Sequence, residues 1–389
     1  QILELIRNYD PDIMWFDTPH KLPPEENLRI LRAAREAKPS LVINGRAVQV
    51  IPDGPEARFG DYASTADRPA ELRRHEGDWE AIPTTNESYG YHRMDLSHKP
   101  PEHFVRLLAK AAARGGNLLM NIGPRGDGRI DPKDVAILEA LRDWMSVYGE
   151  SIRGTTRTPL PVQTWGESTR KGDRIYLHVF EWPRDGRLRV AGMTAEVTRA
   201  WLLAEPNAPP LVVRRLGPRD VEIAVPPHST DPWDGVIGLE IAGAIAPDST
   251  RYLPARGAPI SLHVFDGWRV GEGIGYGDGK RGNDVTQGWR ATDSRLEWKV
   301  RLDERARYRV SVEYATTAAT DTGSFEIVLG DHRLAGRVVP SVGTFVTRDV
   351  GETAVGPGEL VISVRPTNIP GADLMRMRRL VLTPIVNRD

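Results

Sequence analysis

The sequence predicts an α/β region followed by all-β regions. Residues 1–154 alternate helical and strand patterns, which is typical of βα units that build a parallel sheet. Residues 155–243 and 260–389 instead show short runs of alternating polar and apolar residues, punctuated by Pro and Gly. Such runs favour antiparallel strands, so we expect each of these two regions to form a β-sandwich domain. Residues 244–259 lack periodicity and are predicted to be a linker.

The α/β region begins with a helical pattern and an apolar strand that ends at Asp17. Because Thr18 and Pro19 cannot continue a central strand, the carboxylate marks the end of that strand. Further strands are expected at 41–44, 58–62, 78–82 and 117–122, and helices at 2–8, 25–38, 102–114 and 132–148.

The helix boundaries carry their own signals. The stretch 102–114 has apolar side chains three to four residues apart and is followed by two glycines, which favour a helix C-terminus. Asp131 precedes Pro132, and a capping residue followed by proline is typical of a helix start. These boundaries support the interpretation of 1–154 as successive βα units.

A closed (β/α)8 barrel needs eight strands and about 250 residues, whereas about five strands are visible here. The region is therefore either a partial barrel of about five βα units or a different α/β fold. The chain opens at Gln1 inside a helical pattern, and we expect it to be a processed or truncated product.

The amino-acid composition argues against several classes of function. Lys and Arg number 52 against 53 Asp and Glu, which argues against binding nucleic acid through bulk positive charge or binding an anionic membrane. The absence of cysteine excludes disulfides, thiolate metal sites and a cysteine nucleophile. No apolar run reaches the ~20 residues of a membrane span. A secreted or periplasmic location is expected, since such proteins do not require disulfides.

Polar segments follow three of the predicted strands. They are Trp15 to Asp17, Asn44 to Arg46, and a long stretch from Gly60 to Tyr91 that is rich in carboxylates and aromatics. In a barrel of βα units, carboxylates at the carboxyl ends of strands lie in the catalytic mouth. Carboxylates among aromatic rings are typical of sugar chemistry. The alternative is that Asp17 caps a turn.

Other chemistries have weaker signals. The histidines show no HExxH-like spacing and no GxSxG segment is present, so neither a metal site nor a serine nucleophile is expected. The segment 123–128 lacks the Lys-Ser/Thr end of a phosphate loop, and we predict a turn there.

Several of these segments resemble glycoside hydrolase family 29, the α-L-fucosidases. The resemblance rests on Trp15-Phe16-Asp17, Gly60-Asp61-Tyr62, Asp78-Trp79-Glu80, Tyr89-Gly90-Tyr91, Arg114-Gly115-Gly116-Asn117-Leu118-Leu119-Met120-Asn121-Ile122-Gly123-Pro124-Arg125-Gly126-Asp127-Gly128, and Tyr148-Gly149-Glu150-Ser151-Ile152-Arg153-Gly154-Thr155. It covers residues 1 to about 243 and is similar to the second barrel half plus the following β-sandwich.

The resemblance implies a retaining mechanism through a covalent fucosyl-enzyme, without a cofactor or metal. It places the nucleophile on Asp17, sugar-facing aromatics on Trp15 and Tyr89, and a hydroxyl-binding side chain on Arg46. We also expect Trp79 to contact the substrate. Fucosylated oligosaccharides or glycoconjugates are the implied partners.

The acid/base is less fixed in position within this family. We favour Asp67, with Glu80 second and Glu76 third, while Asp61 is expected to support a turn or a neighbouring group. The early barrel strands of the family supply His and Trp residues that bind fucose, and no segment here corresponds to them. The chain alone is therefore expected to be poorly active or inactive.

Two alternatives remain open: a non-catalytic glycan-binding protein, and a related retaining glycosidase that acts on another sugar. The last domain resembles carbohydrate-binding modules. Its aromatics at 276, 289, 298, 308 and 314 either form a sugar-stacking patch or, as we favour, mostly belong to the core. Asp278, Asp284 and Asp293 are either calcium ligands or, as we favour, turn residues.

Overall fold

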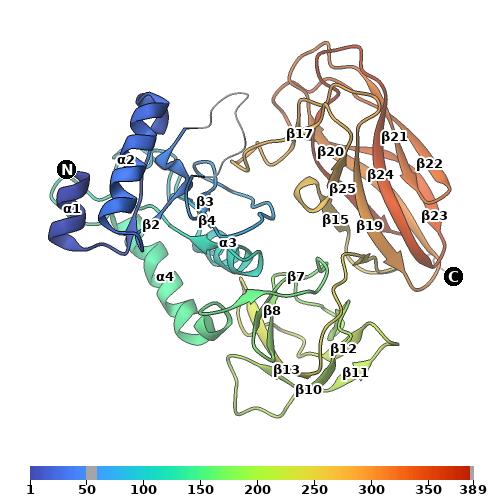
Figure 1. Ribbon diagram of the computed structural model, residues 1–389. Coiled ribbons are helices and arrows are strands. Elements are labelled where there is room, and N and C mark those ends of the chain that lie inside the picture. The colour runs from blue at the N-terminus through green and yellow to red at the C-terminus, as the bar shows by residue number, and fades with distance from the viewer. Residues whose placement is uncertain (50–58, 386–389) are drawn as a thin grey trace.

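A computed structural model describes residues 1–49 and 59–385. Figure 1 shows three groups of elements along the chain: short strands with helices at the N-terminal end, a middle group of sheets, and a larger group of sheets at the C-terminal end. The molecule is richer in strand than in helix. None of the described helices is long and apolar enough to cross a membrane.

The N-terminal strands pair in parallel. One pair is β1 (Ile13–Met14) with β2 (Val42–Ile43), and a second run joins β3 (Ala63–Ser64), β4 (Trp79–Ala81) and β5 (Asn117–Leu118). A parallel bridge between Asn44 and Tyr62 connects the two runs, giving the order β1-β2-β3-β4-β5. The strand expected at 58–62 is displaced, because pairing begins at Tyr62 and continues to Ser64; Arg58 lies outside the described residues.

The helices lie close to their predicted positions. They are α1 (Ile2–Tyr9), α2 (Pro24–Ala37), α3 (Pro101–Ala113) and α4 (Pro132–Tyr148). The carboxylate of Asp131 accepts a hydrogen bond from the backbone N–H of Lys133, so it caps α4 as predicted. Beyond α3 the chain turns at Gly115, whose φ of 75° favours glycine. The α1–α2 side of the sheet has its own buried core, formed by Ile6, Ala34, Leu41, Ile43, Ala47 and Val48.

The middle group contains two antiparallel sheets that share one core. One has the order β10-β13-β8-β7-β6 and the other β11-β12-β9. Their strands are β6 (Thr156–Arg157), β7 (Gly166–Lys171), β8 (Arg174–Val179), β9 (Arg187–Val190), β10 (Glu196–Leu202), β11 (Val213–Arg215), β12 (Val221–Ala224) and β13 (Gly235–Ala242). Ile175 and Leu239 from the first sheet pack with Leu188 and Ile223 from the second, as the alternating sequence patterns predict.

The C-terminal group repeats this arrangement on a larger scale. One sheet runs β14-β19-β24-β21-β22, with β16 also on β19, and the other runs β15-β25-β20-β23; β17 pairs with β18. Their strands are β14 (Arg251–Tyr252), β15 (Ile260–His263), β16 (Trp268–Val270), β17 (Gly275–Tyr276), β18 (Thr286–Gln287), β19 (Arg295–Leu302), β20 (Ala306–Ala315), β21 (Ser324–Leu329), β22 (His332–Arg337), β23 (Val346–Val355), β24 (Gly358–Asn368) and β25 (Arg376–Pro384). Strand β14 lies inside the predicted linker and pairs in parallel with β19.

Residues that we expected in this last core are buried there. Trp289, Trp298, Tyr308 and Tyr314 are each at most 2% exposed, and Tyr276 is partly buried with its hydroxyl donated to the Gly267 carbonyl. These side chains do not form an exposed stacking patch.

Asp278 and the segment 123–128 both lie in turns, as predicted. Asp278 accepts hydrogen bonds from the Lys280 N–H and the Asn283 amide. The segment 123–128 forms a turn in which the Gly128 N–H donates to the Arg125 carbonyl.

A buried arginine connects the three groups of elements. Arg114, at the end of α3, donates to Glu167 on β7 at 2.9 Å and to Asp266 of the C-terminal group at 3.1 Å. Its guanidinium also donates to the Leu72 carbonyl. Burial lowers the pKa of Arg114, but the charges of Glu167 and Asp266 outweigh it and raise the pKa overall. The side chain therefore stays charged and joins the groups.

Candidate active site

The candidate site forms where the parallel strands end. Asp17 follows β1, Arg46 follows β2, Asp67 follows β3 and Tyr89 follows β4. The carboxyl ends of adjacent parallel strands lie at one edge of a sheet, so residues far apart in sequence meet there. In Figure 1 the strands β2, β3 and β4 lie side by side in the N-terminal group.

A buried asparagine fixes the end of β1. Asn44 is fully buried, and its side-chain oxygen accepts from the Phe16 N–H at 2.8 Å while its amide donates to the Phe16 carbonyl at 2.8 Å. The side chain satisfies both backbone groups of the residue that precedes Asp17, where the β1–β2 ladder has ended. The position of Asp17 is thereby set by β2 as well as by β1.

Arg46 brings the first two predicted carboxylates together. Its Nη1 donates to Oδ1 of Asp17 at 2.9 Å, and its Nη2 donates to Oδ1 of Asp67 at 2.8 Å and to the Thr65 carbonyl at 3.0 Å. Burial lowers the pKa of Arg46, but the hydrogen bonds to Asp67 and Asp17 outweigh it and raise the pKa overall. Both carboxylates are about half exposed, at 53% for Asp17 and 48% for Asp67, and are open to a ligand.

Glu80 occupies a more enclosed position beside this pair. It is 8% exposed, and its Oε1 accepts from the Trp15 Nε1–H at 2.5 Å and from the Ser64 hydroxyl at 2.7 Å. Burial raises the pKa of Tyr62 to about 12, and the charge of Glu80 and a hydrogen bond to it act in the same direction. Tyr62 therefore stays a neutral phenol, and Glu80 is held by donors on several sides.

The two predicted sugar-facing aromatics border the same cluster. The Trp15 ring is 37% exposed, and the Arg46 guanidinium carbon lies 5.3 Å from its centroid. The Tyr89 hydroxyl donates to the Ile82 carbonyl at 3.0 Å and accepts from the Arg68 N–H at 3.1 Å. Burial is the main cause that raises the pKa of Tyr89, and the charge of Asp67 adds to it. Tyr89 also has a φ of 61°, an uncommon backbone conformation for a tyrosine.

Two predicted site residues lie elsewhere. Trp79 is 1% exposed and packs with Leu72 and Leu107 in the core, where its Nε1–H donates to the Arg114 carbonyl. Because adjacent residues of a strand point to opposite faces, Trp79 faces away from the site that Glu80 borders, and the prediction of substrate contact is wrong. Glu76, our third choice of acid/base, precedes β4 and lines a different pocket.

Several supporting residues were missed or only partly anticipated. Asp61 has the supporting role expected of it, since it pairs with Arg35 at 2.7 Å and accepts from the Ile43 N–H. Asn44, Tyr62 and Ser64 were not assigned roles, although all three lie in the polar segments that follow the predicted strands. A polar residue directly after an apolar strand was the available signal.

The arrangement offers two accessible carboxylates on one guanidinium, a third enclosed carboxylate and two aromatic rings. Among residues 1–49 and 59–385, no group of His, Asp and Glu side chains has the geometry to hold a metal ion. Paired carboxylates near a substrate perform nucleophilic and acid/base chemistry on glycosidic bonds.

Comparison with known proteins shows what the region of the candidate site is similar to. Residues 1–150 match the family model described as Alpha-L-fucosidase. The α-L-fucosidase of Branchiostoma floridae is 30% identical over 201 residues, which cover 48% of this chain and 43% of that protein. The human tissue α-L-fucosidase is 30% identical over 52% of this chain and 45% of its own length. The chain thus spans less than half the length of these two relatives.

Solved structures of α-L-fucosidases are also similar to this chain. An α-L-fucosidase from Bacteroides thetaiotaomicron, trapped as a covalent intermediate in complex with 2-fluoro-fucosyl fluoride, is 26% identical with a TM-score of 0.56 over 62% of this chain and 60% of that one. The α-L-fucosidase of Vibrio sp. strain EJY3 superimposes with a TM-score of 0.74 over 99% of this chain and 69% of that one. At 20% identity that similarity shows the fold alone. Residues 1–150 are therefore similar to the α-L-fucosidases, glycoside hydrolase family 29.

Proposed function

We propose that the protein is a retaining exo-α-L-fucosidase that removes terminal α-L-fucose from oligosaccharides or glycoconjugates. The observation that carries the proposal is the shared binding of Asp17 and Asp67 by Arg46 at the carboxyl ends of β1 and β3. Retaining glycosidases hold their two carboxyl groups close together, about 5–5.5 Å apart. Two carboxylates bound to one guanidinium satisfy the need for proximity.

In the proposed first step, an oxygen of Asp17 attacks the anomeric carbon of fucose. The bond from that carbon to the leaving oxygen breaks, and Asp67, which must be protonated in the substrate complex, donates its proton to that oxygen. In the second step Asp67 takes a proton from water as the water oxygen attacks the same carbon, and the bond to Asp17 breaks. Arg46 holds Asp17 through Oδ1, and we assign Oδ2 as the attacking atom.

The remaining groups position the sugar. Trp15 presents a partly exposed ring beside Arg46, and Glu80 holds the indole N–H of that ring. Aromatic rings pack on the apolar faces of sugars, so the Trp15–Glu80 hydrogen bond orients a binding surface rather than a reacting atom.

The proposal includes the finer architecture. We assign the parallel strands β1 to β5 to a partial (β/α)8-type barrel, and the two pairs of sheets to β-sandwich domains at 155–243 and 260–389. The shared apolar core within each pair of sheets supports this assignment.

The test is hydrolysis of a nitrophenyl α-L-fucoside by a protein that also carries the family's early barrel strands, because the chain alone is expected to be poorly active or inactive. Asp17→Asn keeps the shape of the side chain but removes the nucleophile, and we predict a fall in kcat of at least about 10³-fold. Asp12→Asn is the matched control, since the Asp12 carboxylate is fully exposed and Asp12 precedes β1, whereas Asp17 follows it.

Three outcomes would contradict the proposal. They are an equal rate for Asp17→Asn and the unsubstituted protein, hydrolysis of a nitrophenyl galactoside in preference to the fucoside, and binding of fucosylated glycans without any hydrolysis.

A further inference from the structure

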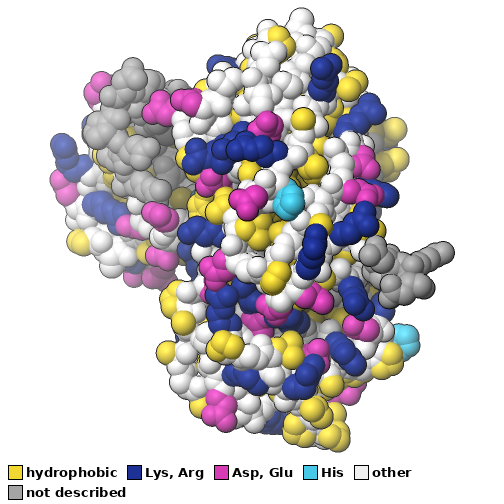
Figure 2. Space-filling view, turned by 90° about the vertical axis from the view of Figure 1, so that its right-hand side faces the viewer, with side chains coloured by type: hydrophobic (Ala, Val, Ile, Leu, Met, Phe, Trp, Pro, Cys, Tyr) yellow, Lys and Arg dark blue, Asp and Glu magenta, His cyan; other side chains and the backbone are white. Residues whose placement is uncertain are grey.

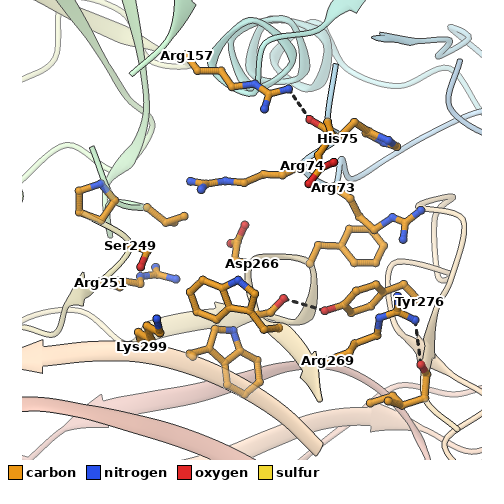
Figure 3. Close-up of a pocket in the computed structure, with 18 of the residues that line it drawn as sticks. Arg73, Arg74, His75, Arg157, Ser249, Arg251, Asp266, Arg269, Tyr276 and Lys299 are labelled. Carbon is orange, nitrogen blue, oxygen red and sulfur yellow. Dashed lines mark hydrogen bonds between the residues drawn. The ribbon is translucent and has the colours of Figure 1, made fainter. Parts of the chain in front are cut away.

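A second pocket lies away from the candidate active site. Its volume is about 800 Å³, and it is lined by residues that precede β4, by the segment around β14 and by the C-terminal sheets. His75 and Glu76 lie before β4, whereas the candidate active site follows the carboxyl ends of the strands. The pocket is thus at the opposite end of the parallel sheet, where all three groups of elements meet (Figure 3).

Positive charge dominates the lining. Six cationic side chains border the pocket: Arg73, Arg74, Arg157, Arg251, Arg269 and Lys299. The acidic lining residues are Glu76, Asp266 and Glu272, and Asp266 is already paired with Arg114. Figure 3 shows Arg74 extending into the open centre of the pocket, towards Ser249 and Arg251. A concave site with an excess of cations concentrates anions.

One of these cations is buried without adequate partners. Arg251 is 8% exposed, and its Nε and Nη1 have no hydrogen-bond partner. Its Nη2 lies 3.5 Å from the Gln163 carbonyl oxygen, which is a long contact. Burial lowers the pKa of Arg251, and the charges of Asp266 and Glu167 only partly offset this. A guanidinium does not deprotonate in proteins, so an anion in the pocket would compensate its charge.

Two further cations are crowded on the opposite wall. Arg73 and Arg269 both lie against the ring of Tyr276, with their guanidinium carbons 5.6 and 4.8 Å from its centroid. Burial lowers the pKa of Arg73, and the charge of Arg269 lowers it further. Bringing like charges together is unfavourable, and a bound anion relieves the repulsion.

The pocket also presents an aromatic surface. The side chain of Trp268 is 43% exposed, although neighbouring Trp298 is buried. The Lys299 ammonium lies 5.7 Å from the Trp268 ring centroid. An exposed ring beside a cation matches a ligand with both an apolar face and a negative group. A sugar ring that carries a sulfate ester or a carboxylate has this combination.

We propose that this pocket is a binding site for acidic carbohydrate, with the negative group held by Arg74 and Arg251 and the sugar ring resting on Trp268. The site is separate from the proposed catalytic one and does not depend on fucose hydrolysis. A nucleic acid fits the surroundings less well, because the chain carries 52 basic against 53 acidic residues. On the face in Figure 2, Lys and Arg are interspersed with Asp and Glu and form no continuous positive surface.

The experiment measures binding by isothermal titration calorimetry with five probes. They are a chondroitin sulfate hexasaccharide, its desulfated and carboxyl-reduced counterpart, an oligogalacturonate, inorganic sulfate and a single-stranded RNA oligomer of similar charge. We expect the pocket to bind at least one of the two acidic sugars, the sulfated or the carboxylated one. The affinity for the uncharged counterpart should be at least tenfold lower. Removing charge-assisted hydrogen bonds produces changes of this order.

Substitutions of lining residues test whether the acidic sugar binds in this pocket. Arg74→Gln with Lys299→Gln should weaken the acidic sugar at least tenfold, and Trp268→Ala should weaken it while leaving inorganic sulfate unaffected. Arg129→Gln with Arg142→Gln is the matched control, because these side chains are 82% and 66% exposed and do not line the pocket. Circular dichroism and thermal unfolding check that each variant is folded.

Three results would overturn the proposal. They are equal affinity for acidic and uncharged sugars, equal affinity of the pocket and control variants, and tighter binding of RNA than of either acidic sugar. Asp17→Asn should bind acidic sugar normally, so failure of the fucosidase proposal is distinguishable from failure of this one.

Discussion

At the scale of single residues, Arg46 is the organising side chain of the candidate site. One guanidinium fixes Asp17, Asp67 and the Thr65 carbonyl, so three strand ends are held by one planar group. Arginine suits this position because its rigid fork of donors binds two carboxylates at once. Glu80, by contrast, accepts hydrogen bonds from Trp15 and Ser64 and is nearly enclosed.

These environments predict different roles for Asp67 and Glu80. Asp67→Asn should remove proton donation, so kcat should fall by about 10²–10⁴-fold for fucosides with poor leaving groups. The fall should be much smaller for a dinitrophenyl fucoside, which needs little protonation. Added azide should restore the rate and yield fucosyl azide.

Glu80→Gln provides the comparison. This substitution should weaken the hydrogen bond that holds the Trp15 ring. Its effect on KM, and its effect on kcat, should be the same for fucosides with good leaving groups as for fucosides with poor ones. Rate measurements across a series of aryl fucosides distinguish the two patterns. A leaving-group dependence and an azide effect that appear for Glu80→Gln instead would reassign the acid/base.

At the scale of elements, the segment between β3 and β4 links the two proposed sites. It carries Asp67 near its beginning and Arg74 near its end. Its middle is held by the C-terminal sheets, since the N–H groups of Ala70 and Glu71 both donate to the Gly279 carbonyl. Gly279 has a φ of 86°, and a side chain there would meet the Glu71 carbonyl oxygen at 2.5 Å. Glycine is therefore required for the close approach.

An ion pair on the same segment makes stability depend on pH. Lys110 on α3 donates to both carboxylate oxygens of Glu71 at 2.8 Å. Burial raises the pKa of Glu71, but the charges of Lys110, His263 and Arg114 outweigh it and lower the pKa from 4.5 to about 2. Because the folded-state pKa is lower than the unfolded one, the stabilisation is complete above pH 4.5 and is lost as pH falls towards 2.

We therefore predict that Glu71→Gln lowers the free energy of unfolding at neutral pH and reduces its fall between pH 4.5 and about 2. Urea denaturation at several pH values measures this. Glu139→Gln on α4 is the control, because the Glu139 carboxylate is 57% exposed and 3.8 Å from Arg142. Parallel pH curves for Glu71→Gln and the unsubstituted protein would contradict the prediction.

At the scale of the whole molecule, Arg114 joins the three groups of elements. Arg114→Met would leave the enclosed carboxylates of Glu167 and Asp266 without their shared cation. Breaking a buried ion pair on one side destabilises by about 3–5 kcal/mol. We predict a loss of this size in chemical denaturation, with little effect for Arg129→Met, which is 82% exposed. A loss below about 1 kcal/mol, the range of surface ion pairs, would contradict the central position of Arg114.

Periodicity was sufficient to place α2, α3 and α4 and to predict antiparallel strands within 155–243 and 260–389, because these apolar patterns repeat over many residues. The parallel strands are only two or three residues long, so the strand expected at 58–62 was displaced. Trp79 was misplaced for a related reason. Both faces of β4 are buried, so alternation does not show which side chains face the site.

The meeting of Asp17, Arg46 and Asp67 was expected in outline, since all three follow adjacent strands. The hydrogen bonds among them were not predicted. The partners are 21 to 29 residues apart in sequence, and local sequence patterns do not show how the intervening backbone folds. Arg114 illustrates the same limit. It was noted only as the start of a family segment, and its partners lie 53 and 152 residues away.

The central claim is that Asp17 forms a covalent bond to fucose, and trapping with 2-fluoro-fucosyl fluoride tests it most directly. For a protein that also carries the family's early barrel strands, the account predicts that intact-protein mass spectrometry will show one added 2-fluoro-fucosyl group. Peptide mapping should locate that group on Asp17, and Asp17→Asn should not be labelled. A label on Asp67 or Glu80, or no label on the unsubstituted protein, would contradict it.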